Sequence, residues 1–486
     1  MFAWQFTEKS DGSSTPIQLR CLVVQLAVWV VAGWQLANSV AQEPSSGPTE
    51  STSATRTPIG VFLDLTSSSP ARRSDALDRI GRNWNDGDSA MLIESARFVK
   101  GRTARASIYR ALSENTGQAL GTNHNDWFRW LWNREVDVHP NYASFKSTLY
   151  ARIDSTFAEY FDDSYEATIR LDEVRWGGVR RDGIPPLKNP ETIPASEATY
   201  LADTDVVFGV SFGGQTRAYP KRILAWHEMV KDNVGGQSIN GVYCTLCGAM
   251  IVYDPATQGK HYELGTSGFL YRSNKLMYDH QTKSMWSTLR GIPVVGPLVG
   301  RGIRLKSLHV VTTTWGKWRQ MHPQTDVLSL RTGHRRNYGE GVAYKSYFAT
   351  DDLMFTVPRL DRRLKNKDDV LVIRGQDDAH VAIAAAFLKT RPVYHGNVQG
   401  NAFVVLTDES GAHRVYESGT NKFLKWNDPQ TVVTDQGDRW RVTEDALILG
   451  SVAGDSQRLR RMSAHRAFWF GWNAAFPEGQ LIHSRQ

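Results

Sequence analysis

A pair of cysteines, Cys244 and Cys247, constrains the folding of this chain more than any other feature. Two runs typical of β-strands flank the pair, residues 238–243 before it and residues 249–254 after it. This arrangement predicts a β-hairpin whose bend presents both thiols. Gly248 follows at a position suited to a positive φ angle, where a side chain would clash. Such a bend can chelate one ion or close a small disulfide ring, and its N–H groups would stabilise thiolates.

The first 41 residues predict an export signal or a membrane anchor. Residues 21–37 are mostly apolar, and residues 39–41 are the small residues that a signal peptidase reads. The apolar run is short for a hydrocarbon core of about 30 Å, which favours a cleaved signal. Residues 1–20 are long and mixed in charge for a signal, so an uncleaved anchor stays open. We expect an exported protein, periplasmic or secreted, either free or tethered to a membrane through residues 21–37.

Export narrows the roles open to the cysteines. Cys21 would leave with the signal, so Cys244 and Cys247 would be the cysteines of the mature protein. In an oxidising compartment two adjacent thiols oxidise unless a metal holds them or redox turnover is their task. A disulfide that closes so short a ring adds little stability, because the entropic effect grows with loop length. Structural stapling is therefore the weakest explanation of the pair.

Composition divides the rest of the chain into a linker, a helical domain and two β-rich repeats. Residues 42–56 are rich in Ser, Thr and Pro and predict a flexible linker. Residues 57–165 carry helix-spaced apolar side chains, beginning with a serine-capped segment at residues 74–80. Residues 176–335 and 336–486 consist of short β-branched and aromatic runs separated by glycine turns. The expected fold class is α+β, a helical domain followed by a mostly β, internally duplicated domain.

The duplication is predicted from a recurring aromatic motif. Two tryptophans and a proline recur with identical offsets at Trp315, Trp318 and Pro323 and at Trp469, Trp472 and Pro477. The second copy has no cysteine and no counterpart of the sequence Trp226-His227-Glu228. We expect one half to carry the site and the other half to serve as scaffold. Convergent aromatic packing is the alternative.

Composition and missing motifs exclude several function classes. The 486 residues are 41% hydrophobic and 22% charged, which is ordinary for a globular protein. The net charge of +7 is spread over short basic groups with no motif for reading nucleic acid, so we expect no nucleic-acid partner. There is no glycine-rich phosphate loop, so we expect no nucleotide cofactor. Ser267 does not lie in a nucleophile elbow, which disfavours a hydrolase.

The residues near the cysteine pair suggest a copper or zinc site. The candidate ligands are Cys244, Cys247, His227, Met277 and Asp279. Two thiolates and one imidazole leave a tetrahedral site one ligand short, and Met277, Asp279, His280 or a water could complete it. An open fourth position would make the site catalytic rather than structural.

Each candidate also has a structural interpretation. His227 could cap a helix or fill a core, and Met277 is a common core residue. Asp279 could form a turn at a strand end. His261 belongs to an exposed strand end, and Trp286 is typical of packing.

Two other function classes stay open. A thiol–disulfide oxidoreductase would use Cys244 and Cys247, but redox-active pairs commonly precede a helix whose dipole lowers the thiol pKa. Residues 248–253 suit a strand instead, which favours a metal-holding turn over a thioredoxin-like site. A non-enzymatic binding module with an aromatic surface is the third class. The sequence does not identify a reaction, a substrate or a partner.

Short motifs in a fixed order run from residue 182 to residue 330. They lie at residues 182–186, 217–220, 226–228, 232–236, 243–248, 267–271, 276–279, 284–287 and 296–298, and a further one lies at residues 464–472. Together they resemble the domain of unknown function 3179 family. The resemblance implies that the cysteine pair and Trp226-His227-Glu228 are characteristic motifs, but it supplies no settled activity. Thr245 stands where the family usually has proline and Arg272 where asparagine is usual; neither change removes a candidate ligand.

Overall fold

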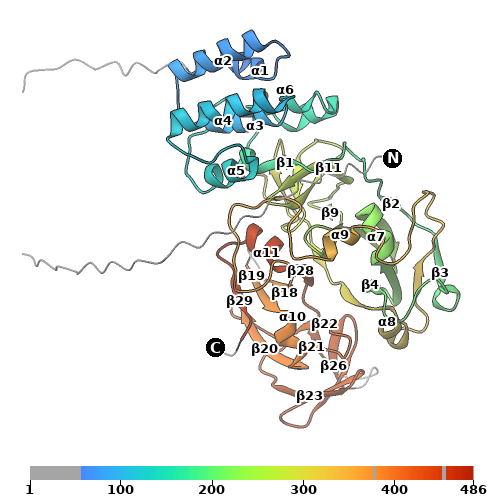
Figure 1. Ribbon diagram of the computed structural model, residues 1–486. Helices are drawn as coiled ribbons and strands as arrows, with labels where there is room; N and C mark the ends of the chain where they lie inside the picture. The colour runs from blue at the N-terminus through green and yellow to red at the C-terminus, as the bar shows by residue number, and fades with distance from the viewer. Residues whose placement is uncertain (1–55, 376–378, 451–455, 485–486) are drawn as a thin grey trace, which may run out of the picture. The chain divides into compact units, whose positions relative to one another are not determined.

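Residues 56–375, 379–450 and 456–484 are described by the computed structural model (Figure 1). Helices dominate up to residue 150 and strands dominate the remainder, which confirms the expected α+β class. The predicted export segment and almost all of the predicted linker, residues 1–55, lie outside the described residues. Within the described residues, no helix is both long enough and apolar enough to cross a bilayer.

Six α-helices come first in the described chain. They are α1 (Ile59–Asp64), α2 (Pro70–Arg82), α3 (Asp88–Ala96), α4 (Arg102–Thr116), α5 (His124–Trp132) and α6 (Tyr142–Tyr150). Helix α2 begins four residues before the predicted segment, because Ser69 rather than Ser74 accepts the capping hydrogen bond, from the N–H of Arg72. Pro70 fits the first helical position, where no N–H is needed. Helices α2 and α4 run alongside each other in Figure 1.

The helices share one hydrophobic core with a five-stranded sheet. The strand order is β1 (Val174–Trp176), β11 (Leu264–Tyr271), β12 (Asn274–Asp279), β13 (Met285–Ser287) and β14 (Ile292–Val295). Phe269 of β11 is the centre of the contact, with the rings of Tyr150 and Phe157 at centroid distances of 5.1 Å and 4.8 Å. Phe157 lies on the 3-10 helix η1 (Ser155–Tyr160). Aromatic side chains bury large areas, so this contact fixes the helical part against the sheet.

A buried ionic cluster lies at the centre of the helical part. The carboxylate of Glu94 is fully buried and accepts hydrogen bonds from Tyr142, at 3.0 Å, from Tyr150, and from the ammonium of Lys146, at 3.1 Å. Burial alone would raise the pKa of Glu94, but Lys146 and Arg97 outweigh burial and hold the pKa below its ordinary value. All members have partners within this core, so the cluster is explained by structure alone.

A second five-stranded sheet carries the cysteines. Its order is β15 (Ser307–Leu308), β8 (Ala249–Tyr253), β7 (Gln237–Cys244), β6 (Met229–Val234) and β2 (Leu187–Lys188). Strands β7 and β8 pair antiparallel, with Cys244 opposite Ala249, which confirms the predicted hairpin. Side chains alternate between two cores along β8, because successive residues of a strand point to opposite faces. The cluster that contains Cys244 and Cys247 is called the sulfur-side core below.

Two further sheets have the same strand order and directions. In one the order is β16 (Val311–Thr314), β4 (Val206–Phe212), β5 (Gln215–Pro220), β17 (Asp326–Leu328) and β3 (Thr192–Pro194). In the other it is β28 (Ala464–Phe468), β18 (Asp369–Arg374), β19 (His380–Ala384) and β29 (Gln480–Ile482). Leaving β3 aside, each sheet has two antiparallel pairs and one parallel pair at the same places.

The helices of these two sheets also correspond. Helix α8 (Trp315–Met321) joins β16 to β17, and α11 (Trp469–Ala475) joins β28 to β29. Each begins at the first tryptophan of the recurring motif, and both tryptophans of each motif are buried. Helix α7 (Lys221–His227) follows β5 as α10 (Ala385–Lys389) follows β19. A duplication would leave this pattern; the duplication itself stays a prediction.

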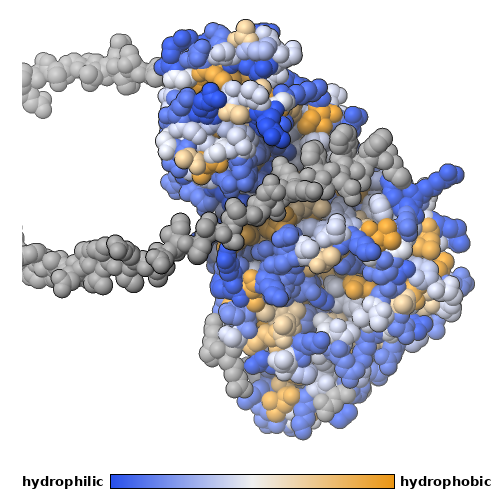
Figure 2. Space-filling model, in the orientation of Figure 1, coloured by the Kyte–Doolittle hydropathy of each residue, from blue (hydrophilic) through white to orange (hydrophobic). Residues whose placement is uncertain are grey.

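The remaining elements are short or lie near the C-terminal end. They are η2 (Leu171–Glu173), η3 (Ala195–Glu197), β9 (Ala256–Thr257), β10 (Lys260–His261) and α9 (Lys345–Phe348), a three-stranded sheet of β20 (Val393–Val398), β21 (Asn401–Thr407) and β22 (His413–Glu417), and a five-stranded sheet of β23 (Phe423–Asp428), β24 (Thr431–Thr434), β25 (Arg439–Val442), β26 (Ala446–Leu449) and β27 (Gln457–Arg460). Hydrophilic side chains dominate the face seen in Figure 2, with apolar ones interspersed among them.

Candidate functional site

The cysteine bend is a buried disulfide. Cys244 and Cys247 are bonded to each other, and their relative exposures are 1% and 0%. Gly248 has a φ angle of 61°, as predicted for the residue after the pair. A Cβ at Gly248 would also lie 2.8 Å from the ring of Phe468, so the bend and β28 meet at van der Waals contact. The glycine is therefore required both by the turn and by its neighbour.

The disulfide closes a ring of residues 244–247, and hydrogen bonds hold residues 245, 246 and 247 in place. The hydroxyl of Thr245 donates to Oε1 of Glu228 at 2.9 Å. The hydroxyl of Tyr347 donates to the carbonyl oxygen of Leu246 at 2.7 Å. The N–H of Phe468 donates to the carbonyl oxygen of Cys247, also at 2.7 Å. These donors and acceptors come from four separate parts of the chain. The bend is consequently fixed by tertiary contacts and not only by its own hairpin.

One side chain, Asn274 at the start of β12, directs an acceptor at a sulfur. Its Oδ1 lies 2.9 Å from Sγ of Cys247. Its Nδ2 donates to the carbonyl oxygens of Arg272 and Gly471, at 3.1 Å each. Because the nitrogen must face those two carbonyls, the oxygen of the amide must face the sulfur.

A buried ion pair lies behind Thr245. Lys275 of β12 donates from Nζ to Oε2 of Glu228 at 2.8 Å, and Tyr344 donates from its hydroxyl to Oε1 at 3.0 Å. Glu228 and Lys275 are 7% and 4% exposed. Removing two charges from water costs free energy that their attraction only partly repays, so this ion pair contributes less to stability than its short distance suggests.

Unusual backbone angles gather around the same bend. Nine non-glycine residues of the described chain have positive φ angles, and four of them surround the cysteines: Glu228, Arg272, Ser273 and Tyr344. Glu228 occupies the left-handed position that ends α7, where glycine or asparagine is the usual residue. A side chain in this conformation costs free energy, and such residues gather where function requires them.

The structure places His227 away from the sulfurs. The ring donates from Nδ1 to the carbonyl oxygen of Pro185 at 2.9 Å, so Nε2 accepts from the hydroxyl of Tyr338 at 2.6 Å. Thr332 lies 2.6 Å from the same hydroxyl, which extends the chain of hydrogen bonds. Burial lowers the pKa of His227 to about 4, so the ring is neutral near pH 7. Both ring nitrogens are used within this chain of hydrogen bonds.

The other candidate ligands divide between the sulfur-side core and turns. Met277 is buried in the sulfur-side core together with both cysteines. Asp279 accepts from the N–H groups of Gln281 and Thr282 at 3.1 Å and 2.6 Å, and from Nε1 of Trp286 at 3.0 Å, as a turn-forming residue does. His261 is exposed in β10. Across the described ranges, no three His, Cys, Asp or Glu side chains gather closely enough to hold a metal ion together. Metal binding stays a prediction.

Sequence reasoning missed most of the residues that surround the sulfurs. Asn274, Lys275, Tyr347, Phe468 and Gly471 lie between 27 and 224 positions after Cys247. The last three lie within residues 336–486, the predicted second repeat, which therefore contributes to the site as well as supporting it. The available signals were the family motif at residues 464–472 and the glycine near its end, Gly471.

The fold and site define an α+β protein with a buried Cys-x-x-Cys disulfide where two similar halves meet. A family model described as "Protein of unknown function (DUF3179)" matches residues 181–479. The match covers more than half of the chain and includes both sheets with the shared strand order except for β29, and the chain belongs to this family. Searches among curated proteins and among solved structures return no significant match.

Substituting Gly471 by alanine should displace the disulfide. A Cβ there would lie 3.0 Å from Cβ of Cys247 and 3.4 Å from Oδ1 of Asn274. We expect Gly471→Ala to lower the free energy of unfolding by about 1–3 kcal/mol in denaturant titrations. Gly81→Ala is the matched control, since Gly81 is also helical and has open space beside it; a gain of up to about 1 kcal/mol is expected. Equal effects of both substitutions would contradict the close packing at Cys247.

His227 should make stability depend on pH. In the unfolded chain, His227 binds a proton below its ordinary pKa of 6.5. In the folded protein, the same ring stays neutral until the pH falls to about 4. Protonation of His227 in the unfolded chain should therefore lower the free energy of unfolding by about 3 kcal/mol as the pH falls from about 6.5 to about 4. Denaturant titrations across that range should show a shallower decline in His227→Gln. His261→Gln, at an exposed position, should keep the wild-type slope, and an unchanged slope in His227→Gln would refute the assignment.

Proposed function

We propose that Cys244 and Cys247 form a redox centre that alternates between a disulfide and two thiols. The observation that carries this proposal is the amide of Asn274, whose oxygen lies 2.9 Å from Sγ of Cys247. A sulfur in a disulfide has no hydrogen to donate, whereas a thiol can donate to this oxygen. The site thus contains the bonded pair and, already oriented, an acceptor that only the reduced pair can use.

The setting differs from that of a thioredoxin-like site. The residues after Cys247 form strand β8 rather than a helix, so the pair does not directly precede a helix as thioredoxin-like pairs do. The charged group that is hydrogen-bonded to the bend is Glu228, and Lys275 is paired with it. Any adjustment of thiol reactivity must come from these groups and from hydrogen bonds to the bend.

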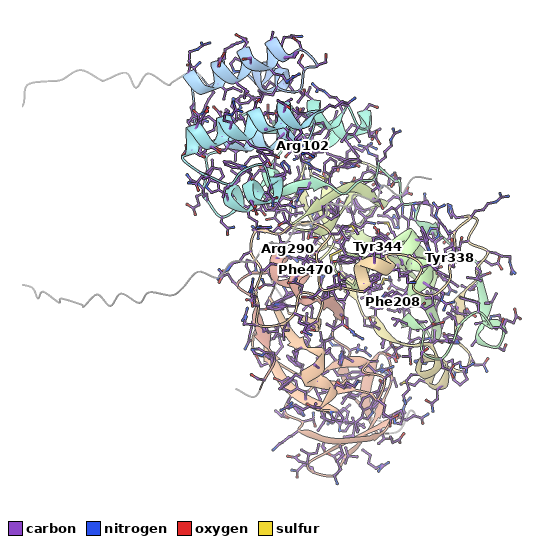
Figure 3. The ribbon with its side chains drawn as sticks, viewed as in Figure 1. Arg102, Phe208, Arg290, Tyr338, Tyr344 and Phe470 are labelled. Atoms are coloured by element: carbon purple, nitrogen blue, oxygen red, sulfur yellow. A yellow bond between two sulfur atoms is a disulfide. The ribbon has the colours of Figure 1, made fainter. Side chains whose placement is uncertain are left out.

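A short segment, residues 344–348, which we call the cover, packs against the sulfur-side core. It consists of Tyr344 and helix α9; the hydroxyl of Tyr347 donates to the bend, and that of Tyr344 donates to Glu228 (Figure 3 labels Tyr344). Lys367 holds the cover in place by donating to the carbonyl of Tyr347. Because the cysteines are nearly unexposed, an exchange partner reaches the sulfurs only when residues packed around the bend move, and the cover is a short segment among them.

The proposed reaction is thiol–disulfide exchange. A partner thiolate attacks one sulfur, the Cys244–Cys247 bond breaks, and its electron pair stays on the other sulfur. A second partner thiolate then releases the first as a partner disulfide. The chain gains two electrons and two protons and ends with two thiols, and the partner dithiol is oxidised.

Equilibration with a reference dithiol and its disulfide tests this proposal. We expect reversible conversion of the pair in the folded protein, measured by acid quenching, alkylation and mass spectrometry. Asn274→Ala should shift the equilibrium toward the disulfide by about fivefold, because the thiol loses its acceptor. Asn115→Ala, which also removes an amide bonded to a carbonyl, is the control and should leave the equilibrium unchanged. A pair that is reduced only on unfolding, or an Asn274→Ala equilibrium equal to wild type, would reject the proposal.

Copper or zinc binding by the reduced pair is the second candidate, favoured by the presence of Met277 in the sulfur-side core. Reduced protein incubated with either metal and then desalted should retain one ion, and Cys244→Ser should lose it. Equal retention by both proteins would reject the site.

A binding module without cysteine chemistry, the third class, predicts wild-type behaviour after both cysteines are replaced.

A further inference from the structure

We infer that the outward face of the five-stranded sheet β23–β27 binds to a bilayer surface that contains anionic lipids. Five cationic side chains lie on this face and are together called the cationic face below: Lys425, Arg439, Arg441, Arg458 and Arg460. Figure 1 labels strands β23 and β26 of the sheet. The inference does not depend on the cysteine pair, because it rests on a different set of residues.

The register of the strands brings these cations together. Lys425 and Arg439 flank the same residue of β24, and Arg441 and Arg458 flank the same residue of β26. Side chains that pair across antiparallel strands share a face of the sheet. Arg439 and Arg441 are two positions apart on β25, so both rows lie on one face. Arg460 lies two positions beyond Arg458 on β27 and joins them.

The opposite face of the sheet is buried. Trp440 of β25 lies in a hydrophobic core that it shares with Val404 and Leu406 of β21. Because successive side chains of a strand point to opposite faces, Arg439 and Arg441 point away from this core. All five members of the cationic face are exposed. The cationic face is therefore directed at solvent.

Four of these five cations lack a partner. Arg460 pairs with Glu417 of β22 at 3.2 Å. Within the described parts of the chain, the side chains of the other four form no ion pair and no hydrogen bond. The register places one carboxylate on the same face, that of Asp428 at the end of β23, and it accepts from the N–H of Gln430. Like charges gathered on one face repel one another, so the face is complementary to a negatively charged surface.

The cations are spread over the face in two dimensions. They lie on alternate strands of the sheet, β23, β25 and β27. From the ordinary spacing of strands and residues, neighbouring cations have Cα atoms about 10 Å apart across the sheet and about 7 Å apart along a strand. A plane of lipid headgroups can meet all of them together, but a single extended polyanion follows one line. The arrangement therefore favours a bilayer surface as the partner.

An exposed apolar side chain lies at the edge of the cationic face. Leu424 is 53% exposed, the most exposed large apolar residue of the described chain. A bulge places it next to Lys425, opposite β24. At a membrane, an apolar side chain beside cations enters the boundary between headgroups and acyl chains. Single-stranded nucleic acid would instead call for aromatic side chains that stack on bases, and the outward positions of the described strands have none.

Partitioning of the protein between buffer and vesicles tests the inference. Vesicles of phosphatidylcholine alone are compared with vesicles that also contain phosphatidylglycerol. The readout is the ratio of the two partition coefficients, in which any binding by residues 21–37 that is common to both kinds of vesicle cancels. Each cation near an anionic surface contributes about fivefold to binding. The ratio should therefore fall by about a hundredfold or more when glutamine replaces Lys425, Arg439, Arg441 and Arg458, and salt at about 1 M should lower the wild-type ratio in the same way.

The matched control removes the same number of charges from exposed positions of α2 and α4. Its substitutions are Arg82→Gln, Arg102→Gln, Arg105→Gln and Arg110→Gln. The ratio of partition coefficients should stay at the wild-type value, because these positions lie outside the cationic face. An equal loss in the two variants would overturn the inference by showing that net charge alone decides binding.

Chemical labelling of the wild-type chain tests the same inference without a substitution. Lys425 should lose most of its reactivity toward an acetylating reagent when the phosphatidylglycerol vesicles are added, as measured by mass spectrometry. Lys100, which is also exposed, should keep its reactivity. Unchanged reactivity of Lys425 would overturn the inference. Wild-type protein that binds polyphosphate in solution but shows no preference for the anionic vesicles would assign the face to a linear polyanion and would overturn it as well.

Discussion

The hydrogen bond from the N–H of Phe468 to the carbonyl oxygen of Cys247 joins the two halves of the molecule at the cysteine bend. Everything else at the site depends on this junction. The same β28–α11 segment brings Gly471 against Cys247 and provides a carbonyl that orients Asn274. A side chain at Gly471 would separate the halves, because protein interiors leave no space for an extra methyl group.

The site combines an apolar shell with a small polar interior. The sulfurs lie among buried aliphatic and aromatic side chains, where unpaired polar groups would be costly. Glu228 and Lys275 are nevertheless held beside the bend, and each carboxylate oxygen has a donor. Four non-glycine residues with positive φ angles surround this interior. The coincidence of buried charge and unfavourable backbone angles distinguishes the bend from the Glu94 cluster, which has regular helical backbone and partners within its own core.

Local patterns in the sequence predicted the elements well and the site poorly. The strand-like runs on either side of Cys244 and Cys247 predicted the hairpin, and Gly248 predicted its bend, because both depend on neighbours in sequence. His227 was predicted as a metal ligand because it lies close to the cysteines in sequence, but its hydrogen-bond partners are Pro185 and Tyr338. Asn274 and Phe468 could not be found, since nothing local marks which residues will meet across a sheet or between halves.

The sequence by itself determined the α+β class, the thiol-bearing hairpin, the recurring tryptophan motif and membership of the family. These features follow from periodicity, turn chemistry and ordered motifs, which short stretches of chain encode. Only the tertiary structure decided that the sulfurs are bonded and buried, that Glu228 rather than His227 contacts the bend, and that the half without cysteines completes the site. The last outcome depends on packing between segments more than 200 residues apart, and side-chain packing of that kind is specified by the whole fold rather than by any one stretch.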